Sequence, residues 1–225
     1  MDKLLKIDLR RCKNLEILPS TLCTLKRLKS LVLSDCSKFK KLPEEIGNLE
    51  CLEKLLLDGT AVSELPPSIG CLKNLKVLSC RKSSSQSPTS VFQYLFQLSK
   101  CQKPTRSLVL PPIWGLTSLT LLDLTDCNLL VIPRDLGSLF SLKKLCLGGN
   151  NFENLPSLNQ FSQLAHLELN RCEMLRELPE LPPRIRRLFA NDCASLIVSA
   201  NRFAMCKIEH VWFQNCRKLL NYGEN

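Results

Sequence analysis

The sequence predicts an α/β solenoid, a fold in which short units stack along one axis, and three observations predict it. A nine-residue phrase, L-x-x-L-x-L-x-x-C, recurs along almost all of the 225 residues. Its successive starts are separated by 24, 24, 23, 44, 23, 22, 21 and 23 residues. Apart from the step of 44, which is about double the others, these separations lie within the roughly 20–29 residues of a leucine-rich repeat. A Leu-Pro or Ile-Pro dipeptide follows at a similar offset in most units. The expected architecture is a leucine-rich-repeat horseshoe, with a concave parallel β-sheet and a mostly irregular or short-helical convex side. The nine starts are Leu4, Leu28, Leu52, Leu75, Leu119, Leu142, Leu164, Ile185 and Ile208.

One unit, residues 28–51, shows why these residues predict that fold. Leu31 and Leu33 alternate with other residues, the period-two pattern of a short strand with one buried face. Leu42-Pro43 then begins a return segment, because proline fixes φ and cannot donate to a strand ladder. A single unit cannot bury its own leucines, so neighbouring units must stack and share one core.

The ninth position of the phrase holds, in every unit, a small residue that can form hydrogen bonds with backbone. We predict that these side chains form a buried ladder along the solenoid, because buried turn amides and carbonyls need partners. If so, these cysteines have a structural role. Because the sequence has no C-x-x-C pair, we expect no zinc site and no other metal. Oxidation of adjacent ladder cysteines is a less favoured alternative. The ladder residues are Cys12, Cys36, Thr60, Ser83, Cys127, Asn150, Cys172, Cys193 and Cys216.

Cysteine usage and the absence of targeting segments predict a compartment. The chain contains 13 cysteines without a disulfide-like spacing, which suits a reducing environment. Its first residues carry scattered charges rather than the apolar stretch of a secretory signal. No apolar run is long enough to cross a membrane, and no Asn-x-Ser/Thr sequon occurs. We expect a cytoplasmic or nucleocytoplasmic protein without a membrane partner.

The doubled step divides the chain. We predict leucine-rich repeats over residues 1–82, a polar insertion loop over 83–107, further repeats over 108–207, and a degenerate last repeat or truncated cap over 208–225. The insertion is either a tolerated surface loop, which we favour, or a contact element for a partner domain. Leu4 opens a repeat without a polar cap, so we expect the chain to be a piece of something longer.

Function is expected on the concave face, where the third, fifth and seventh residues of each phrase point. Aromatic residues and arginine are the usual anchors of protein interfaces, so the last three units predict a protein-binding site. Alternatively, a downstream cap covers Phe189 and Trp212. The two histidines lie two strands apart, about 10 Å, too far to share one zinc. The candidate partner-binding residues are His166, Glu168, Arg187, Phe189, His210 and Trp212 in the last units, and Lys6 and Arg10 in the first.

Charge and motifs narrow the function further. The formal net charge is +10, but the basic runs lie mostly on return loops without interleaved aromatic residues. We therefore expect an acidic protein surface or an acidic neighbouring domain as partner rather than nucleic acid. Phosphate-binding glycine loops, a G-x-S-x-G elbow and an H-E-x-x-H motif are all missing from the sequence. We expect no enzyme and no cofactor.

With the repeats laid out, several segments resemble the repeat domain of plant intracellular immune receptors. They are residues 31–36, 42–47, 57–60, 122–127, 147–152 and 178–183, and the insertion before Leu110-Pro111 is similar as well. The resemblance is to the class that combines a Toll/interleukin-1-receptor-like domain, a nucleotide-binding switch and C-terminal leucine-rich repeats. It covers about residues 4–220, but only the third domain of that architecture.

That resemblance implies a role in defence: recognition of a pathogen effector or a host guardee, and restraint of the nucleotide-binding domain of the same receptor. The phosphate-binding loop and the catalytic glutamate of the class belong to its other domains, so nucleotide binding and NAD cleavage are not expected of these residues. The runner-up is a stand-alone intracellular signalling scaffold or decoy. A ubiquitin-ligase arm would need an adaptor-binding helical motif that is not visible, and an extracellular ectodomain would need the missing signal and sequons.

Overall fold

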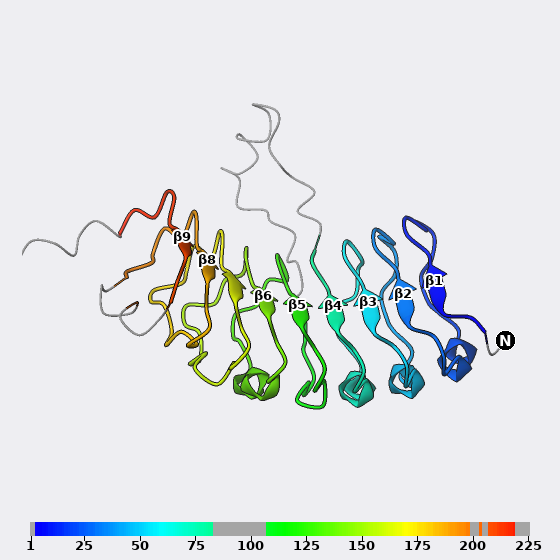
Figure 1. The fold of residues 1–225 in the computed structure, drawn as a ribbon. Helices are drawn as coiled ribbons and strands as arrows, with labels where there is room; N and C mark the ends of the chain where they lie inside the picture. The colour runs from blue at the N-terminus through cyan, green and yellow to red at the C-terminus, as the bar shows by residue number, and fades with distance from the viewer. Residues whose placement is uncertain (1–2, 83–106, 199–202, 204–206, 219–225) are drawn as a thin grey trace, which may run out of the picture.

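Nine short parallel strands form one curved sheet in the computed structural model (Figure 1). The structure describes residues 3–82, 107–198, 203 and 207–218. The strands pair in chain order from β1 to β9, as expected for a stacked solenoid, so the predicted horseshoe is confirmed. Their bounds are β1 Lys6–Asp8, β2 Ser30–Val32, β3 Lys54–Leu56, β4 Val77–Ser79, β5 Leu121–Asp123, β6 Lys144–Cys146, β7 His166–Glu168, β8 Arg187–Phe189 and β9 His210–Trp212.

The leucine pattern explains the strand register. The middle residue of each strand points into the core and pairs with the middle residue of the next strand, as Leu31 does with Leu55. From β2 to β8 this residue is fully buried, whereas Val211 in β9 is 38% exposed. The difference follows from position, because each interior strand is covered on both sides by a neighbouring repeat.

Short 3₁₀ helices occupy the convex side, which confirms the short-helical expectation. They are η1 Ser20–Thr24, η2 Ile46–Asn48, η3 Pro67–Cys71 and η4 Arg134–Ser138. Three of them begin directly after the proline of the Leu/Ile-Pro sequence or contain it, because proline is already set for a helical start and needs no donor there. Trp114 takes the place of the glycine that follows Ile46 and Ile69 in earlier repeats; it is 64% exposed, and no helix is assigned around it.

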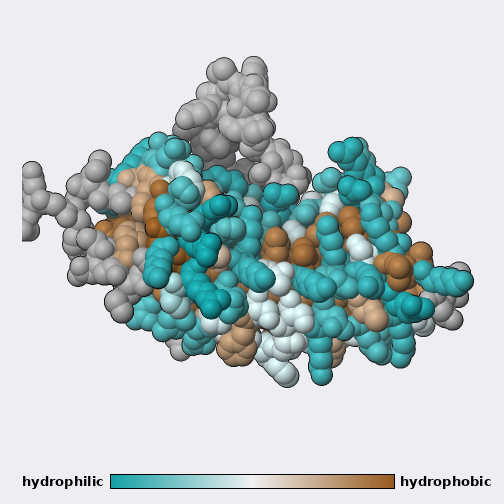
Figure 2. All heavy atoms as spheres, viewed as in Figure 1, coloured by the Kyte–Doolittle hydropathy of each residue, from teal (hydrophilic) through white to brown (hydrophobic). Residues whose placement is uncertain are grey.

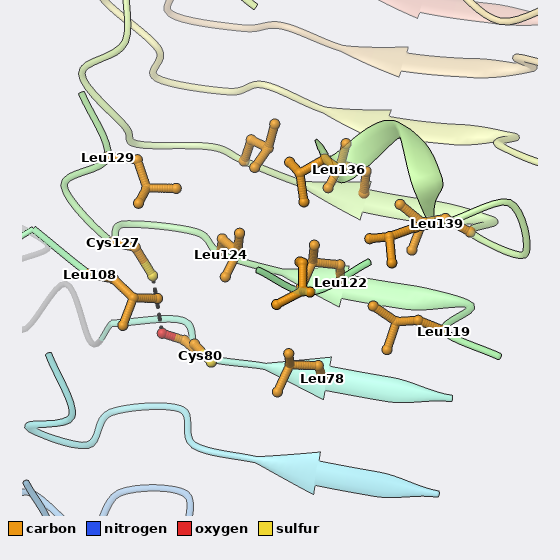
Figure 3. Packing of buried hydrophobic residues seen from close by; sticks show 14 of the residues in the cluster. Leu78, Cys80, Leu108, Leu119, Leu122, Leu124, Cys127, Leu129, Leu136 and Leu139 are labelled. Atoms are coloured by element: carbon orange, nitrogen blue, oxygen red, sulfur yellow. Dashed lines mark hydrogen bonds between the residues drawn. The ribbon is translucent and has the colours of Figure 1, made fainter. Parts of the chain in front are cut away.

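One continuous apolar core runs through the repeats. Figure 3 shows its middle section, with Leu78 of β4, Leu122 of the neighbouring strand β5 and Leu124 just after β5. Phe39, Phe152 and Phe161 fill the space behind the strands and are almost fully buried. Since each repeat buries its side chains against the next, the solenoid holds the strands at a fixed spacing and presents their other face to solvent.

The insertion does not interrupt the sheet. β4 and β5 pair directly, with Val77 opposite Leu121, although 44 residues separate them. Val109 forms an isolated parallel bridge with Glu64, so the chain rejoins the repeat pattern there. Residues 83–106 lie outside the described residues, as do 219–225, so the predicted loop and the predicted end of the last repeat remain predictions.

The turn after each strand contains a feature that the sequence reasoning missed. The eighth residue of the phrase has a positive φ in eight repeats, because the chain must reverse sharply before the ninth side chain points inward. Glycine, Asp and Asn tolerate this conformation best. The recurrence of Gly, Asp and Asn directly before the ninth position could have predicted this turn from the sequence. Two arginines at the same position obscure the pattern. The eight residues are Arg11, Asp35, Gly59, Asp126, Gly149, Arg171, Asp192 and Asn215.

Candidate functional site

The ninth side chains form hydrogen bonds from one repeat to the one before it. Cys127 donates its thiol to the backbone carbonyl of Cys80, with Sγ 3.2 Å from the oxygen (Figure 3). The acceptor is the sixth residue of the preceding phrase, and the same relation holds in four other repeats. The bonds join Cys36 to Leu9 (3.0 Å), Cys172 to Leu147 (3.3 Å), Cys193 to Leu169 (3.2 Å) and Cys216 to Ala190 (2.9 Å).

Asn150 makes the strongest connection in the ladder. Its Nδ2 donates to the carbonyls of Leu124 (2.9 Å) and Leu147 (2.8 Å), and its Oδ1 accepts from the backbone N–H of Leu129 at 2.9 Å. The residue is completely buried. An amide thus serves three backbone groups of two repeats, whereas a thiol serves mainly one.

Two ladder positions at the N-terminal end behave differently. Cys12 is exposed, so its predicted burial is wrong. The reason is that it belongs to the first repeat of the chain, which no earlier repeat covers. Thr60 is buried, but its hydroxyl donates to Leu57 of its own repeat at 2.7 Å rather than to the preceding one. Ser83, the remaining predicted ladder residue, lies outside the described residues.

The buried thiols have the electrostatics of structural groups. Burial raises the pKa of Cys127, Cys172 and Cys193 to about 12 in each case. A thiol at that pKa is almost entirely protonated near neutral pH and is a poor nucleophile. Within the described part of the chain the structure holds no group of three or more His, Cys, Asp or Glu side chains placed to bind a metal ion.

On the concave face, three rings gather at the end of the sheet. The rings of Phe189 and Trp212 are stacked, with centroids 4.2 Å apart and planes at 2°. The ring of His210 lies 5.3 Å from that of Trp212. We call Phe189, His210 and Trp212 the aromatic cluster. The rings of Phe189 and Trp212 meet because their residues are opposite each other in the β8–β9 register, and both side chains remain partly exposed.

Four basic residues begin the last four strands and lie in one line across the sheet. Register places Lys144 opposite His166, His166 opposite Arg187 and Arg187 opposite His210. We call these four residues the basic row. Neither Lys144 nor Arg187 has an ion pair among the described residues. Burial lowers the pKa of His166, and the cations of Arg187 and Lys144 lower it further.

Glu168 is an acidic residue on the concave face of β7. It lies in the line behind the basic row, opposite Cys146 on one side and Phe189 on the other. Its Oε1 accepts a long hydrogen bond of 3.5 Å from Asn170. The structure therefore brings six predicted site residues together on β7, β8 and β9: His166, Glu168, Arg187, Phe189, His210 and Trp212.

The other two predicted residues lie at the opposite end of the sheet. Lys6 and Arg10 flank Asp8, with Lys6 Nζ 3.3 Å and Arg10 Nη2 2.9 Å from Asp8 Oδ2. Arg10 also donates through Nε to Asp8 Oδ1 at 3.0 Å. These hydrogen bonds, above all those from Arg10, hold the pKa of Asp8 well below its usual range. The two cations share one carboxylate at this end and do not join the C-terminal group.

A polar hollow separates the two ends. It is lined by charged residues that include Asp58, Arg81 and Asp123. Arg171 reaches over Gly149 to Asp126, with Nη2 3.0 Å from Oδ2, and closes one edge of the hollow. Sequence reasoning missed this pair because its members lie 45 residues apart and share only the eighth position of the phrase.

Figure 2 shows how these groups look from outside. Hydrophilic side chains cover most of the visible face, and hydrophobic ones gather in separate patches, one of them at the β8–β9 end. In the described ranges, no helix has the length and apolar character needed to cross a membrane.

Comparison with known proteins identifies the repeats. A family model described as a leucine-rich repeat region matches residues 3–95, and a second leucine-rich-repeat model matches residues 118–139. The chain is 38% identical over 223 residues to the disease resistance-like protein DSC1 of Arabidopsis thaliana. It is 41% identical over 192 residues to the TMV resistance protein N of Nicotiana glutinosa. These matches cover 96% and 84% of this chain but only 17% and 15% of those relatives.

Solved structures show the same fold at lower identity. The leucine-rich repeat domain of the type III effector XopL superposes with a TM-score of 0.77 at 21% identity, over 96% of this chain and 70% of that one. The functional domain of InlJ from Listeria monocytogenes, described as including a cysteine ladder, gives 0.65 at 16% identity, over 95% of this chain and 42% of that one. The chain belongs to the leucine-rich-repeat family and, within it, to the repeat domains of plant nucleotide-binding disease resistance proteins of the Toll/interleukin-1-receptor-like class. It is thus a defence-related repeat domain with the fold of a protein-interaction scaffold.

Proposed function

We propose that this chain is the part of a plant innate immune receptor that senses a pathogen effector or a host guardee and restrains the nucleotide-binding switch. We place it in the cytoplasm, with the nucleotide-binding domain of the same receptor as its second partner. The observation that carries the proposal is the aromatic cluster at one end of the concave sheet, beside Lys144 and Arg187, which have no ion pair within the described part of the chain.

Two properties of the cluster support binding to a protein. Trp and Arg are the residues that most often dominate the energy of protein interfaces, and here Trp212 and Arg187 lie on adjacent strands. The stacked ring of Phe189 and the repeat core beneath it hold Trp212 in place, so little side-chain freedom is lost on binding. A rigid aromatic surface of this kind is suited to recognise another protein surface.

The chemistry of the site supports recognition rather than catalysis. The ladder thiols have strongly raised pKa values and point into the core. His166 faces cations, which disfavour its protonation, and Asp8 is already bound to Arg10. The titratable groups of the concave face are thus arranged as surface charges, consistent with a scaffold.

The test uses the complete reading frame that encodes this chain, expressed in leaves that are then challenged with a pathogen. The double variant Phe189→Ala/Trp212→Ala should lose pathogen-triggered cell death while accumulating to the wild-type level on an immunoblot. Val32→Ala/Leu56→Ala is the matched control, because both residues occupy the same fifth position in β2 and β3. An unchanged response in the Phe189/Trp212 variant would refute the assignment of the site.

The same experiment separates sensing from restraint. Loss of the response indicates that the cluster recognises the pathogen-derived or guarded protein. Cell death without a pathogen would instead indicate that the cluster holds the switch in its resting state. A stand-alone scaffold or decoy is the second candidate; it predicts that the leaf response does not depend on a linked nucleotide-binding domain.

A further inference from the structure

We propose that the partner segment bound at the C-terminal concave surface is acidic and carries an aromatic side chain. The segment lies across β6, β7, β8 and β9, with its carboxylates over the basic row and its aromatic ring over Phe189 and Trp212. This inference rests on the proposed function and adds the chemistry of the ligand.

The basic row carries the first part of the argument. Adjacent strands in a sheet are about 4.8 Å apart, so Lys144, His166, Arg187 and His210 form a closely spaced line of cationic and titratable groups. Lys144 and Arg187 lie on either side of His166, whose protonation is disfavoured by burial and by these two cations, so the fixed positive charges of the row are those of Lys144 and Arg187. Within the described residues no carboxylate pairs with Lys144 or Arg187, whereas Asp8 pairs with both Lys6 and Arg10 at the other end.

The charges around the row limit where the anion can lie. Arg186 precedes Arg187 but is paired with Glu209, whose Oε1 is 3.7 Å from Arg186 Nη1. Glu168 lies in the line behind the row, so a carboxylate placed there would be repelled. The favourable place is therefore above the third position of the strands, over Lys144 and Arg187.

The rings of Phe189 and Trp212 lie beside the basic row and provide the apolar part of the site. Behind Arg187 and His210 the fifth position holds Phe189 and Trp212, whose parallel stacked rings form one apolar surface. An aromatic side chain of the partner can stack on an edge or face of this pair, which contributes about 0.5–1.5 kcal/mol beyond area burial in known pairs. The carboxylates of the partner over the basic row and its aromatic ring over the aromatic cluster together define one orientation of the segment.

Spacing adds a specific expectation. Lys144 on β6 and Arg187 on β8 are two strands apart, roughly 10 Å. A chain in the polyproline II conformation advances about 3.1 Å per residue with three residues per turn, so two carboxylates three residues apart lie on one side of it and match that separation. The expected motif therefore has acidic residues at i and i+3, with an aromatic residue next to the one that meets Arg187.

The experiment is a selection of displayed random peptides on the full chain, without any bias toward a region of its surface. We expect the recovered peptides to be enriched in an Asp/Glu pair three residues apart beside Phe, Tyr or Trp. Their affinity, measured by fluorescence anisotropy of the synthetic peptides, should fall as salt concentration rises, because exposed charges are screened. Enrichment of basic or purely apolar peptides, or of none, would overturn the inference.

Matched variants locate the binding. Lys144→Gln/Arg187→Gln should weaken binding of the acidic peptides about tenfold, because two exposed ion pairs with carboxylates are lost. Lys29→Gln/Lys54→Gln removes two cations beside β2 and β3, at the other end of the sheet, and should leave affinity unchanged. Equal weakening by both pairs would show a nonspecific charge effect and would contradict the inference.

Two further arms separate this inference from its alternatives. Single-stranded DNA of mixed sequence should not compete for the peptide site; effective competition would favour a nucleic acid and overturn the acidic-protein inference. Peptides that depend on Phe189 and Trp212 but lack acidic residues would also overturn it, while leaving the proposed protein-binding site intact. The two proposals therefore fail in different ways.

Discussion

The two ends of the solenoid use the same repeat to different effect. At the N-terminal end, Asp8 forms ion pairs with both Lys6 and Arg10, and the ladder is incomplete at Cys12 and Thr60. At the C-terminal end, Lys144 and Arg187 are without ion pairs in the described ranges, aromatic rings stack, and the ladder residues from Cys127 onward each bond the preceding repeat.

This difference separates the requirements of folding from those of binding. Among the described residues every buried side-chain nitrogen or oxygen has a hydrogen-bond partner, while Lys144 and Arg187 on the C-terminal concave surface have no ion pair. On the N-terminal surface, Asp8 binds both Lys6 and Arg10 within β1 and the residues that follow. A surface with unsatisfied cations and fixed aromatic rings is the one prepared for a ligand.

The largest expected difference between the two ends concerns thiol reactivity. Only the thiolate reacts, and burial raises the pKa of Cys172 to about 12. Iodoacetamide at pH 8 should therefore label exposed Cys12 at least ~100-fold faster than Cys172, as followed by mass spectrometry of the peptides. In concentrated urea both should react at similar rates. Equal labelling in the native protein would show that the C-terminal ladder opens readily.

The next largest effect concerns the ladder hydrogen bonds. Asn150→Leu leaves two carbonyls and one N–H without their partner, so the free energy of unfolding should fall by about 3 kcal/mol. Thr60→Val removes one bond within a single repeat and should cost about 1 kcal/mol. Urea denaturation measures both. Similar losses would mean that bonds between repeats contribute no more than bonds within one.

A smaller effect concerns the titration of His166. Burial lowers its pKa first, and the neighbouring cation of Arg187 lowers it further. Arg187→Gln should therefore raise the pKa of His166 but leave it below the usual histidine value, since burial remains; Lys54→Gln should not change it. Proton NMR of the imidazole gives both values. An unchanged pKa in Arg187→Gln would show that Arg187 does not face His166.

The sign of the stability effect follows from the same shift. Because the pKa of folded His166 is lower than its unfolded value, the unfolded chain binds this proton more readily. His166 therefore contributes a loss of stability as the pH falls below about 6.5, and none well above it. His166→Gln should weaken the acid-induced loss of stability measured by urea denaturation at pH 5 and pH 8.

The smallest effect is expected at the N-terminal charge group. Asp8→Asn should leave the midpoint of urea denaturation almost unchanged, because ion pairs on the surface are screened by water. The variant should, however, leave Lys6 and Arg10 unpaired and give the N-terminal end a basic surface. A large loss of stability would show that this group supports the fold rather than only neutralising the surface.

The repeat arithmetic predicted the fold and the strand register because a fixed period leaves little choice of which leucines meet. It also placed Phe189 and Trp212 on one face, since alternation along strands is strict. It could not predict that Asp8 forms ion pairs with both Lys6 and Arg10, because side-chain pairing depends on rotamers rather than on register. The phrase also predicted the buried ladder residues from Cys36 onward that bond backbone. It did not predict that Cys12 is exposed, because burial of a ladder side chain depends on a repeat stacked before it.

The positive φ at the eighth position shows a further limit. Arg11 and Arg171 adopt it although a long side chain is disfavoured there, because the turn between strand and ladder imposes the conformation on whichever residue is present. Propensity would have excluded these two residues. Repeat position was the stronger predictor, since the stacked neighbours determine the path of the chain.

The central claim is that binding is concentrated at the C-terminal concave end. The most direct measurement is an alanine scan of the exposed third, fifth and seventh positions of all nine strand phrases, reading affinity for the tightest peptide recovered from the unbiased selection. The account predicts that the sensitive positions fall on β6 to β9, with Trp212 and Arg187 strongest. Sensitive positions spread evenly along the sheet, or grouped on β1 to β3, would contradict it.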